Sequence, residues 1–172
     1  MDRLLLVLAP VGALVGLAFW VAIGAPWVER MQPRTAPEQP IAFDHNLHVV
    51  AAGIDCAFCH RTAADGTAAG MPSVEQCMFC HQAIGRGQPE MEKLRTAWTA
   101  GQPIDWARVH RLPDHVRFFH DAHVRAGVSC ATCHGEVGQV QQVTQVRPLS
   151  MADCVDCHRQ SNAPTDCATC HH

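Results

Sequence analysis

The sequence predicts a mainly α-helical and irregular fold, in which one N-terminal transmembrane helix precedes a domain of short helices and loops. Three features of the 172 residues support this prediction. Residues Leu4 to Val28 include no charged side chain, ten cysteines recur in one short pattern, and long apolar runs are scarce beyond Val28. The formal net charge of −3 offers no excess of basic residues, so we expect no nucleic-acid partner.

The apolar segment from Leu4 to Val28 is long enough to cross a bilayer, because a transmembrane helix needs about 20 apolar residues. A cleaved signal peptide is the alternative, but its apolar region usually has about 7–15 residues. We therefore predict an uncleaved anchor over residues 1–28 and a single-pass location in the cell inner membrane, with the folded domain on the periplasmic face. Residues 29–40 include three prolines and are predicted to form an extended linker.

One pattern, Cys-x-x-Cys-His, occurs five times in residues 41–172 and uses every cysteine. A Phe-x-His-x-x-His stretch precedes the first and the third copies, so a larger unit is also repeated. The repeats predict a multihaem-type division into modules 41–88 and 118–160, a connecting segment 89–117 and a terminal motif 161–172. Within the connecting segment, apolar residues at helical spacing predict an amphipathic helix over residues 89–98.

Cys-x-x-Cys-His is the attachment signal of c-type haem, in which two thioethers hold the porphyrin and the histidine is the proximal iron ligand. Zinc sites do not need a histidine after each cysteine pair, and iron–sulfur clusters usually use four grouped cysteines. We therefore predict a domain built around five covalently bound haems. The attachment residues are Cys56, Cys59, Cys77, Cys80, Cys130, Cys133, Cys154, Cys157, Cys167 and Cys170.

Ten histidines are predicted to bind the five irons, and no catalytic residue is predicted. The proximal ligands are His60, His81, His134, His158 and His171. The distal ligands are His45, His48, His120, His123 and His110. The first four form two pairs at positions i and i+3, which lie on nearly the same side of a helix. We expect the first histidine of each pair to serve the local haem and the second to reach another.

The fifth distal ligand is the most open of these assignments. His110 is preferred, whereas His115 and His172 are expected to be solvated. Met71 or Met151 could replace histidine at one iron, which would raise the reduction potential of that haem. The competing interpretation is that both methionines only fill gaps in the packing.

Four stretches carry a family resemblance, namely residues 70–81, 103–113, 118–135 and 149–159. They resemble the pentahaem cytochrome c subunit of bacterial alternative complex III, which belongs with small multihaem cytochromes that carry Phe-x-His-x-x-His ligand pairs. The resemblance covers about residues 40–170 and implies a subunit that relays electrons from membrane quinol oxidation to a periplasmic cytochrome c. It implies as partners polytopic quinol-binding membrane subunits, an iron–sulfur subunit, and a monohaem cytochrome c or another soluble acceptor.

The sequence leaves open whether the chain is itself an enzyme, and we expect a non-catalytic subunit of a quinol:electron acceptor oxidoreductase complex. The alternative is a self-contained, membrane-anchored multihaem quinol dehydrogenase that feeds a periplasmic reductase. An open iron site would favour this alternative. The chain has enough histidines to saturate every iron, which favours the relay.

Overall fold

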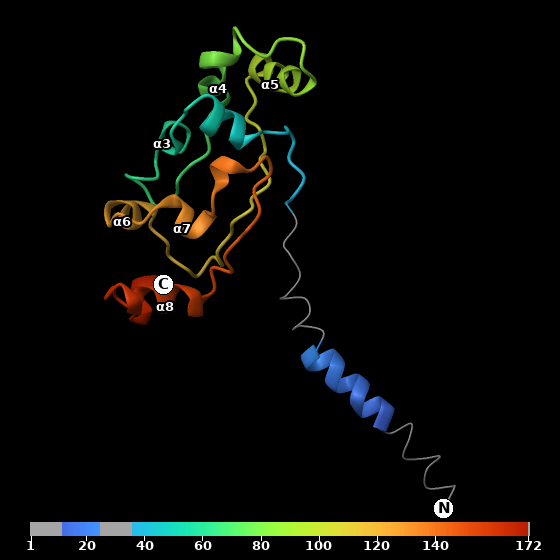
Figure 1. Cartoon of the computed structure of the whole chain (residues 1–172), viewed down its shortest axis with the longest axis vertical. Coiled ribbons are helices and arrows are strands. Elements are labelled where there is room, and N and C mark those ends of the chain that lie inside the picture. Colours follow the sequence, from blue (N-terminus) through green and yellow to red (C-terminus); the bar gives the residue numbers. More distant parts are fainter. Residues whose placement is uncertain (1–11, 25–35, 172) are drawn as a thin grey trace, which may run out of the picture. The chain divides into compact units, whose positions relative to one another are not determined.

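The computed structural model describes residues 12–24 and 36–171. The chain divides into two compact units, Met1–Thr35 and Ala36–His172, and each is described by itself. In the first unit the described residues form one helical segment over 12–24, drawn in blue in Figure 1. Its last part is the π-helical turn η1 (Trp20–Gly24).

The prediction of a transmembrane helix over residues 4–28 needs correction. At 1.5 Å per residue the described segment 12–24 is about 20 Å long, whereas the hydrocarbon core of a bilayer is about 30 Å thick. Among the described residues, no helix is both long and apolar enough to cross a membrane. Residues 4–11 and 25–28 of the predicted span lie outside the described residues. The same finding overturns the predicted single-pass inner-membrane location.

The second unit consists of short helices and irregular segments. Its elements are η2 (Leu47–Ala51), α3 (Cys56–Cys59), α4 (Val74–His81), α5 (Pro89–Ala100), α6 (His120–Arg125), α7 (Cys130–His134), η3 (Val137–Gln139), α8 (Met151–Gln160) and α9 (Cys167–Cys170). Within residues 36–171 the only β-type pairing is an isolated bridge between Val116 and His171. The helical and irregular part of the predicted fold class is thus confirmed.

Polar residues begin the helices that carry the cysteines. A helix starts readily where a side chain accepts a hydrogen bond from one of the first backbone N–H groups. Four attachment helices, α3, α4, α8 and α9, have such a cap, supplied by Asp55, Ser73, Ser150 and Asp166 respectively. Local capping therefore fixes where four of the five attachment helices begin, even though α3 and α9 have only four residues each.

The amphipathic helix predicted between the modules is confirmed as α5. Pro89 occupies its first turn, where the missing N–H costs nothing, and Gly101 ends it in the left-handed conformation with φ of 63°. Leu94 is 4% exposed and faces α4. With Ile41, Val74 and Met78 it forms a small apolar core in this part of the unit.

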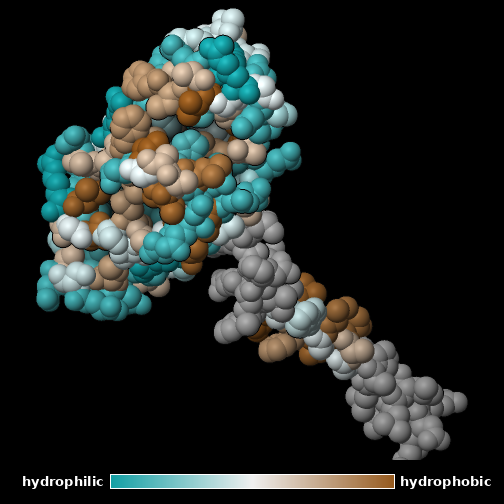
Figure 2. All heavy atoms as spheres, turned by 45° about the horizontal axis from the view of Figure 1, so that its top comes forward, coloured by the Kyte–Doolittle hydropathy of each residue, from teal (hydrophilic) through white to brown (hydrophobic). Residues whose placement is uncertain are grey.

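The rest of the unit has no comparable core. From residue 107 to 171, the described residues are at most partly buried. Large apolar side chains are instead exposed across the unit, and Figure 2 shows them as brown atoms interspersed with polar ones. Phe58, Phe79, Phe119 and Val146 are examples, each more than two-fifths exposed. Side chains of this kind are suited to contact with the flat apolar faces of porphyrins.

Candidate haem-binding sites

All ten cysteines lie within the described residues, and none of them forms a disulfide. In each motif the two cysteines are three positions apart on a helical turn, so both thiols can face one edge of a single porphyrin. The five motifs thus have the free thiols that thioether attachment requires.

Histidine rings lie opposite one another at a spacing that suits a shared metal ion. Two imidazoles that bind one metal from opposite sides, at metal–nitrogen distances of about 2.0–2.1 Å, place their ring centres roughly 6 Å apart. Three pairs of predicted ligands have this spacing: His48 and His81 at 6.0 Å, His120 and His134 at 6.4 Å, and His123 and His158 at 6.0 Å. Each pair joins one motif histidine to one histidine outside the motifs.

The pairs follow the same rule in both modules. The second histidine of Phe-x-His-x-x-His faces the second motif of its own module, as His48 faces His81. The first histidine lies by the first motif of its own module, as His120 lies opposite His134 in the second module. In the first module burial lowers the pKa of His45, and the neighbouring His60 lowers it further. By analogy with His120 and His134 in the second module, His45 and His60 are the corresponding pair in the first.

The phenylalanine of the repeat orients both histidines, a role that sequence reasoning missed. Phe43 stacks on His48, with ring centres 4.3 Å apart and planes at 23°, and meets the edge of His45 at 4.8 Å and 82°. Phe118 makes the same two contacts with the histidines that follow it, at 4.8 Å and 89° and at 4.5 Å and 25°. The signal was present in the sequence, because phenylalanine is part of the repeated unit.

Backbone carbonyls set the direction of many of these rings. The Nδ1 atoms contact carbonyl oxygens as follows: His48 with Asp44 and His123 with Phe119, both at 2.8 Å, His60 with Gly70 at 2.8 Å, His120 with Thr67 at 2.9 Å, and His158 with Pro164 at 2.6 Å. When Nδ1–H donates to a carbonyl, the lone pair of Nε2 is available to a metal. These rings thus hold the tautomer that a haem iron binds.

The two modules exchange contacts through their histidine segments. The backbone N–H of Asp121 donates to the Gly66 carbonyl, which follows the first motif, at 3.1 Å. In return Asn46 donates to the carbonyl of Gly138, in η3 after the third motif, at 3.4 Å. The first and third motifs therefore lie at the centre of the unit, between the second and fourth.

Neighbouring thiols define the order of the motifs along the unit. Burial raises the pKa of these cysteines, and a thiol of another motif raises it further. The neighbours are Cys77 and Cys59, Cys56 and Cys130, Cys133 and Cys157, and Cys154 and Cys170. The motifs thus follow one another in the order second, first, third, fourth and fifth. Figure 1 shows the same sequence of helices, from α4 through α3 and α7 to α8.

His134 occupies the middle of this row. Its pKa is lowered to about 4, first by burial and then by His110, His120 and His60. A neutral imidazole is the form that binds iron. Beside it lies a hollow of about 260 Å³, and four of its eight lining residues are valines, including Val137 and Val146.

The remaining predicted ligands are placed as follows. His110 meets the ring of His134 edge-on, with centres 4.5 Å apart and planes at 84°. His115 lies instead by the fifth motif, its ring 5.6 Å from that of His171. Met71 and Met151 are 59% and 69% exposed. His172 lies outside the described residues.

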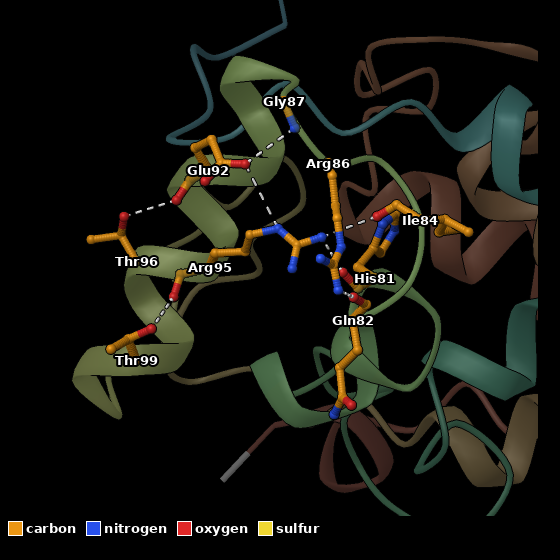
Figure 3. Close-up of polar contacts among 9 residues, drawn as sticks. All are labelled: His81, Gln82, Ile84, Arg86, Gly87, Glu92, Arg95, Thr96 and Thr99. Carbon is orange, nitrogen blue, oxygen red and sulfur yellow. Dashed lines mark hydrogen bonds and ion pairs between the residues drawn. The ribbon is translucent and has the colours of Figure 1, made fainter.

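Figure 3 shows a cationic cluster at the end of α4, beside the second motif. Arg95 extends from α5 and donates to the carbonyls of His81 and Ile84. Its other side faces Glu92, with Nε 3.7 Å from a carboxylate oxygen. Arg86 donates to the Gln82 carbonyl at 3.0 Å. Arg95 thus fixes the backbone of a proximal-ligand candidate and brings a positive charge close to it.

Comparison with known proteins agrees with this geometry. Residues 116–172 match the family described as cytochrome c7 and related cytochrome c, and residues 25–105 match the class III cytochrome c family. Both parts of the chain are thus similar to multihaem c-type cytochromes. Such cytochromes bind haem covalently and transfer electrons. The multihaem cytochrome c subunit of a menaquinone reductase from Nitratidesulfovibrio vulgaris is 28% identical over 189 positions, which cover 94% of this chain and 87% of that protein.

Proposed function

We propose that this cytochrome holds five haems, each bound by two histidines, and serves as the electron-relay subunit of a quinone-linked oxidoreductase complex. The observation that carries the proposal is the facing of histidine rings at 6.0–6.4 Å, which pairs motif histidines with histidines from outside the motifs. A bound haem supplies reversible one-electron chemistry at its iron. The residues of this chain supply the attachment, the axial ligands and the spacing.

Saturation of the axial positions favours a relay over catalysis. A catalytic haem needs a position at which substrate can bind, whereas paired imidazoles occupy both positions. The facing pairs are His48 with His81, His120 with His134, and His123 with His158, and His45 lies near His60. This arrangement disfavours a self-contained quinol dehydrogenase, which would need an open iron.

The order of the motifs supports an unbranched path. The second motif, on α4, and the fifth, on α9, stand at opposite ends of the row defined by the thiol neighbours. A donor and an acceptor would accordingly dock at different ends. All the proposed ligands are histidines, so the ligands themselves favour neither direction of electron flow along the haems. The partners would set that direction.

The proposed partners follow from two likenesses. The relative from Nitratidesulfovibrio vulgaris is a menaquinone reductase subunit, and the sequence resembles the pentahaem subunit of alternative complex III. Both assemblies connect quinone with a multihaem chain. We therefore propose quinone-binding membrane subunits and an iron–sulfur subunit at one end, with a monohaem cytochrome c or other soluble carrier at the other.

The test is to purify the tagged full chain from its own host with its bound partners. We expect mass spectrometry to find five haems on the chain, ferric spectra to be low-spin throughout, and the complex to exchange electrons between a menaquinol analogue and a soluble cytochrome c. Deleting this chain should abolish that exchange while quinone binding by the other subunits persists. Full exchange without the chain, or fewer than five haems, would refute the proposal.

A further inference from the structure

We propose that His115 is the distal ligand of the fifth haem, and that His110 is a packing partner of His134. The inference deepens the proposed function, since it assumes that the fifth motif carries a haem. It assigns His115, and not the nearby His110, as the fifth distal ligand.

The ring geometry is the first argument. His115 and His171 face each other with centres 5.6 Å apart and planes at 18°. The pair at the third motif, His120 and His134, is likewise nearly parallel, at 6.4 Å and 7°. Both separations are close to the roughly 6 Å expected for two imidazoles on opposite sides of one metal ion. His115 therefore has the same relation to His171 as His120 has to His134.

The backbone holds His115 in this position. The neighbouring residue Val116 forms the isolated bridge with His171, and the N–H of Arg117 donates to the carbonyl of Cys170 at 2.7 Å. The Nδ1 atom of His171 also contacts the His115 carbonyl at 3.4 Å. Three contacts with Cys170 and His171 thus tie the segment 115–117 to the end of the fifth motif, although more than fifty positions separate the two in the sequence.

His110 and His134 have a different geometry from these pairs. The ring centre of His110 is 4.5 Å from that of His134 and its plane is almost perpendicular, which leaves too little room for an iron between them. His134 is also paired with His120, at 6.4 Å and 7°. An edge-to-face contact of this kind orients the ring of His134, so we regard His110 as a positioning residue for the third haem.

The two roles predict different spectra for two single variants of the full chain. In the ferric state, His115→Ala should convert one haem in five to the high-spin form, measured by electron paramagnetic resonance and by the high-spin charge-transfer absorption. His110→Ala should leave all haems low-spin. Free imidazole added to His115→Ala should restore the low-spin spectrum, and His115→Met should give one low-spin haem of raised potential.

Imidazole rescue separates a lost ligand from a damaged fold, because a misfolded domain would not recover with a small ligand. Five haems must be counted on both variants by mass spectrometry. A low-spin His115→Ala variant, or high-spin haem in His110→Ala alone, would overturn the inference and leave the relay function standing. Fewer than five haems on the wild-type chain would instead overturn the proposed function.

Discussion

The two modules hold their histidines in almost the same geometry but support them by different means. In the first module α4 packs on α5, and Met78 and Leu94 are 3% and 4% exposed. In the second module the described residues are at most partly buried, and no helix corresponding to α5 follows α8. The repeated Phe-x-His-x-x-His and Cys-x-x-Cys-His motifs therefore set the geometry of the histidines. The packing that stabilises each module can differ.

The link between the two attachment helices shows the same contrast. In the first module Gln76 on α4 donates directly to the carbonyl of Phe58 in α3. In the second, Asp153 holds the position corresponding to Gln76, and Arg147 bridges it to the carbonyl of Thr132, the residue corresponding to Phe58. The corresponding carbonyls thus accept a hydrogen bond from an amide in the first module and from an ion-paired arginine in the second.

The largest difference should come from matched methionine truncations. Met78→Ala removes a side chain that is 3% exposed, and Met151→Ala one that is 69% exposed. We expect Met78→Ala to lower the free energy of unfolding by about 2–4 kcal/mol, as core truncations do, and Met151→Ala by less than about 0.5 kcal/mol. Guanidinium unfolding followed by circular dichroism measures both.

Equal losses in the two variants would show that haem, and not the α4–α5 contact, provides the stability of the first module. Met151→Ala also examines the other interpretation of that residue. If Met151 bound an iron, its removal would change the ferric spectrum. Its 69% exposed side chain would then have to become covered when haem binds.

The sequence predicted local features better than long-range ones. The five motifs and α5 lie in short stretches, so repeats and helical spacing reveal them. The neighbourhood of His115 and His171 depends on a backbone contact across 56 positions, for which no local pattern exists. The predicted transmembrane helix rested on apolar composition alone, and no helix among the described residues is long and apolar enough to cross a membrane.

A smaller effect should separate the two interhelical links. Asp153→Asn breaks a two-point ion pair, with distances of 2.6 and 3.2 Å, whose side chains are 20–30% exposed. We expect a loss of about 1 kcal/mol that shrinks as salt is raised, since salt screens partly exposed charges. Gln76→Ala should cost about 1–2 kcal/mol at any salt concentration, because it leaves a carbonyl without its donor.

The control for this comparison is Asp156→Asn on the same helix, α8. Asp156 faces Arg159 at 3.8 Å and is 66% exposed, so its loss should hardly alter unfolding. The measurement is the midpoint of thermal unfolding in low and high salt. A salt-dependent loss in Gln76→Ala, or none in Asp153→Asn, would contradict the distinction between an amide link and an ionic one.

The smallest effect concerns the reduction potential of the second haem relative to the fourth. His158 Nδ1 contacts the Pro164 carbonyl at 2.6 Å, a bond that makes an axial histidine more electron-rich and lowers the potential. His81 makes no such bond of good geometry, and Arg95 occupies the neighbouring Ile84 carbonyl at 3.2 Å. A nearby cation also favours the reduced, less positive iron, so both features should raise the potential of the second haem.

Arg95→Gln should therefore lower one of the five potentials by on the order of 40 mV, which corresponds to about 1 kcal/mol for one electron. Arg86→Gln is the matched control, since Arg86 binds the Gln82 carbonyl at the same end of α4 but does not contact His81 or Ile84 in Figure 3. Spectroelectrochemical titration of the full chain measures the potentials. A shift of equal size in both variants would mean that total surface charge sets the potential, and the particular contact between Arg95 and the backbone of the second motif would then have no separate role.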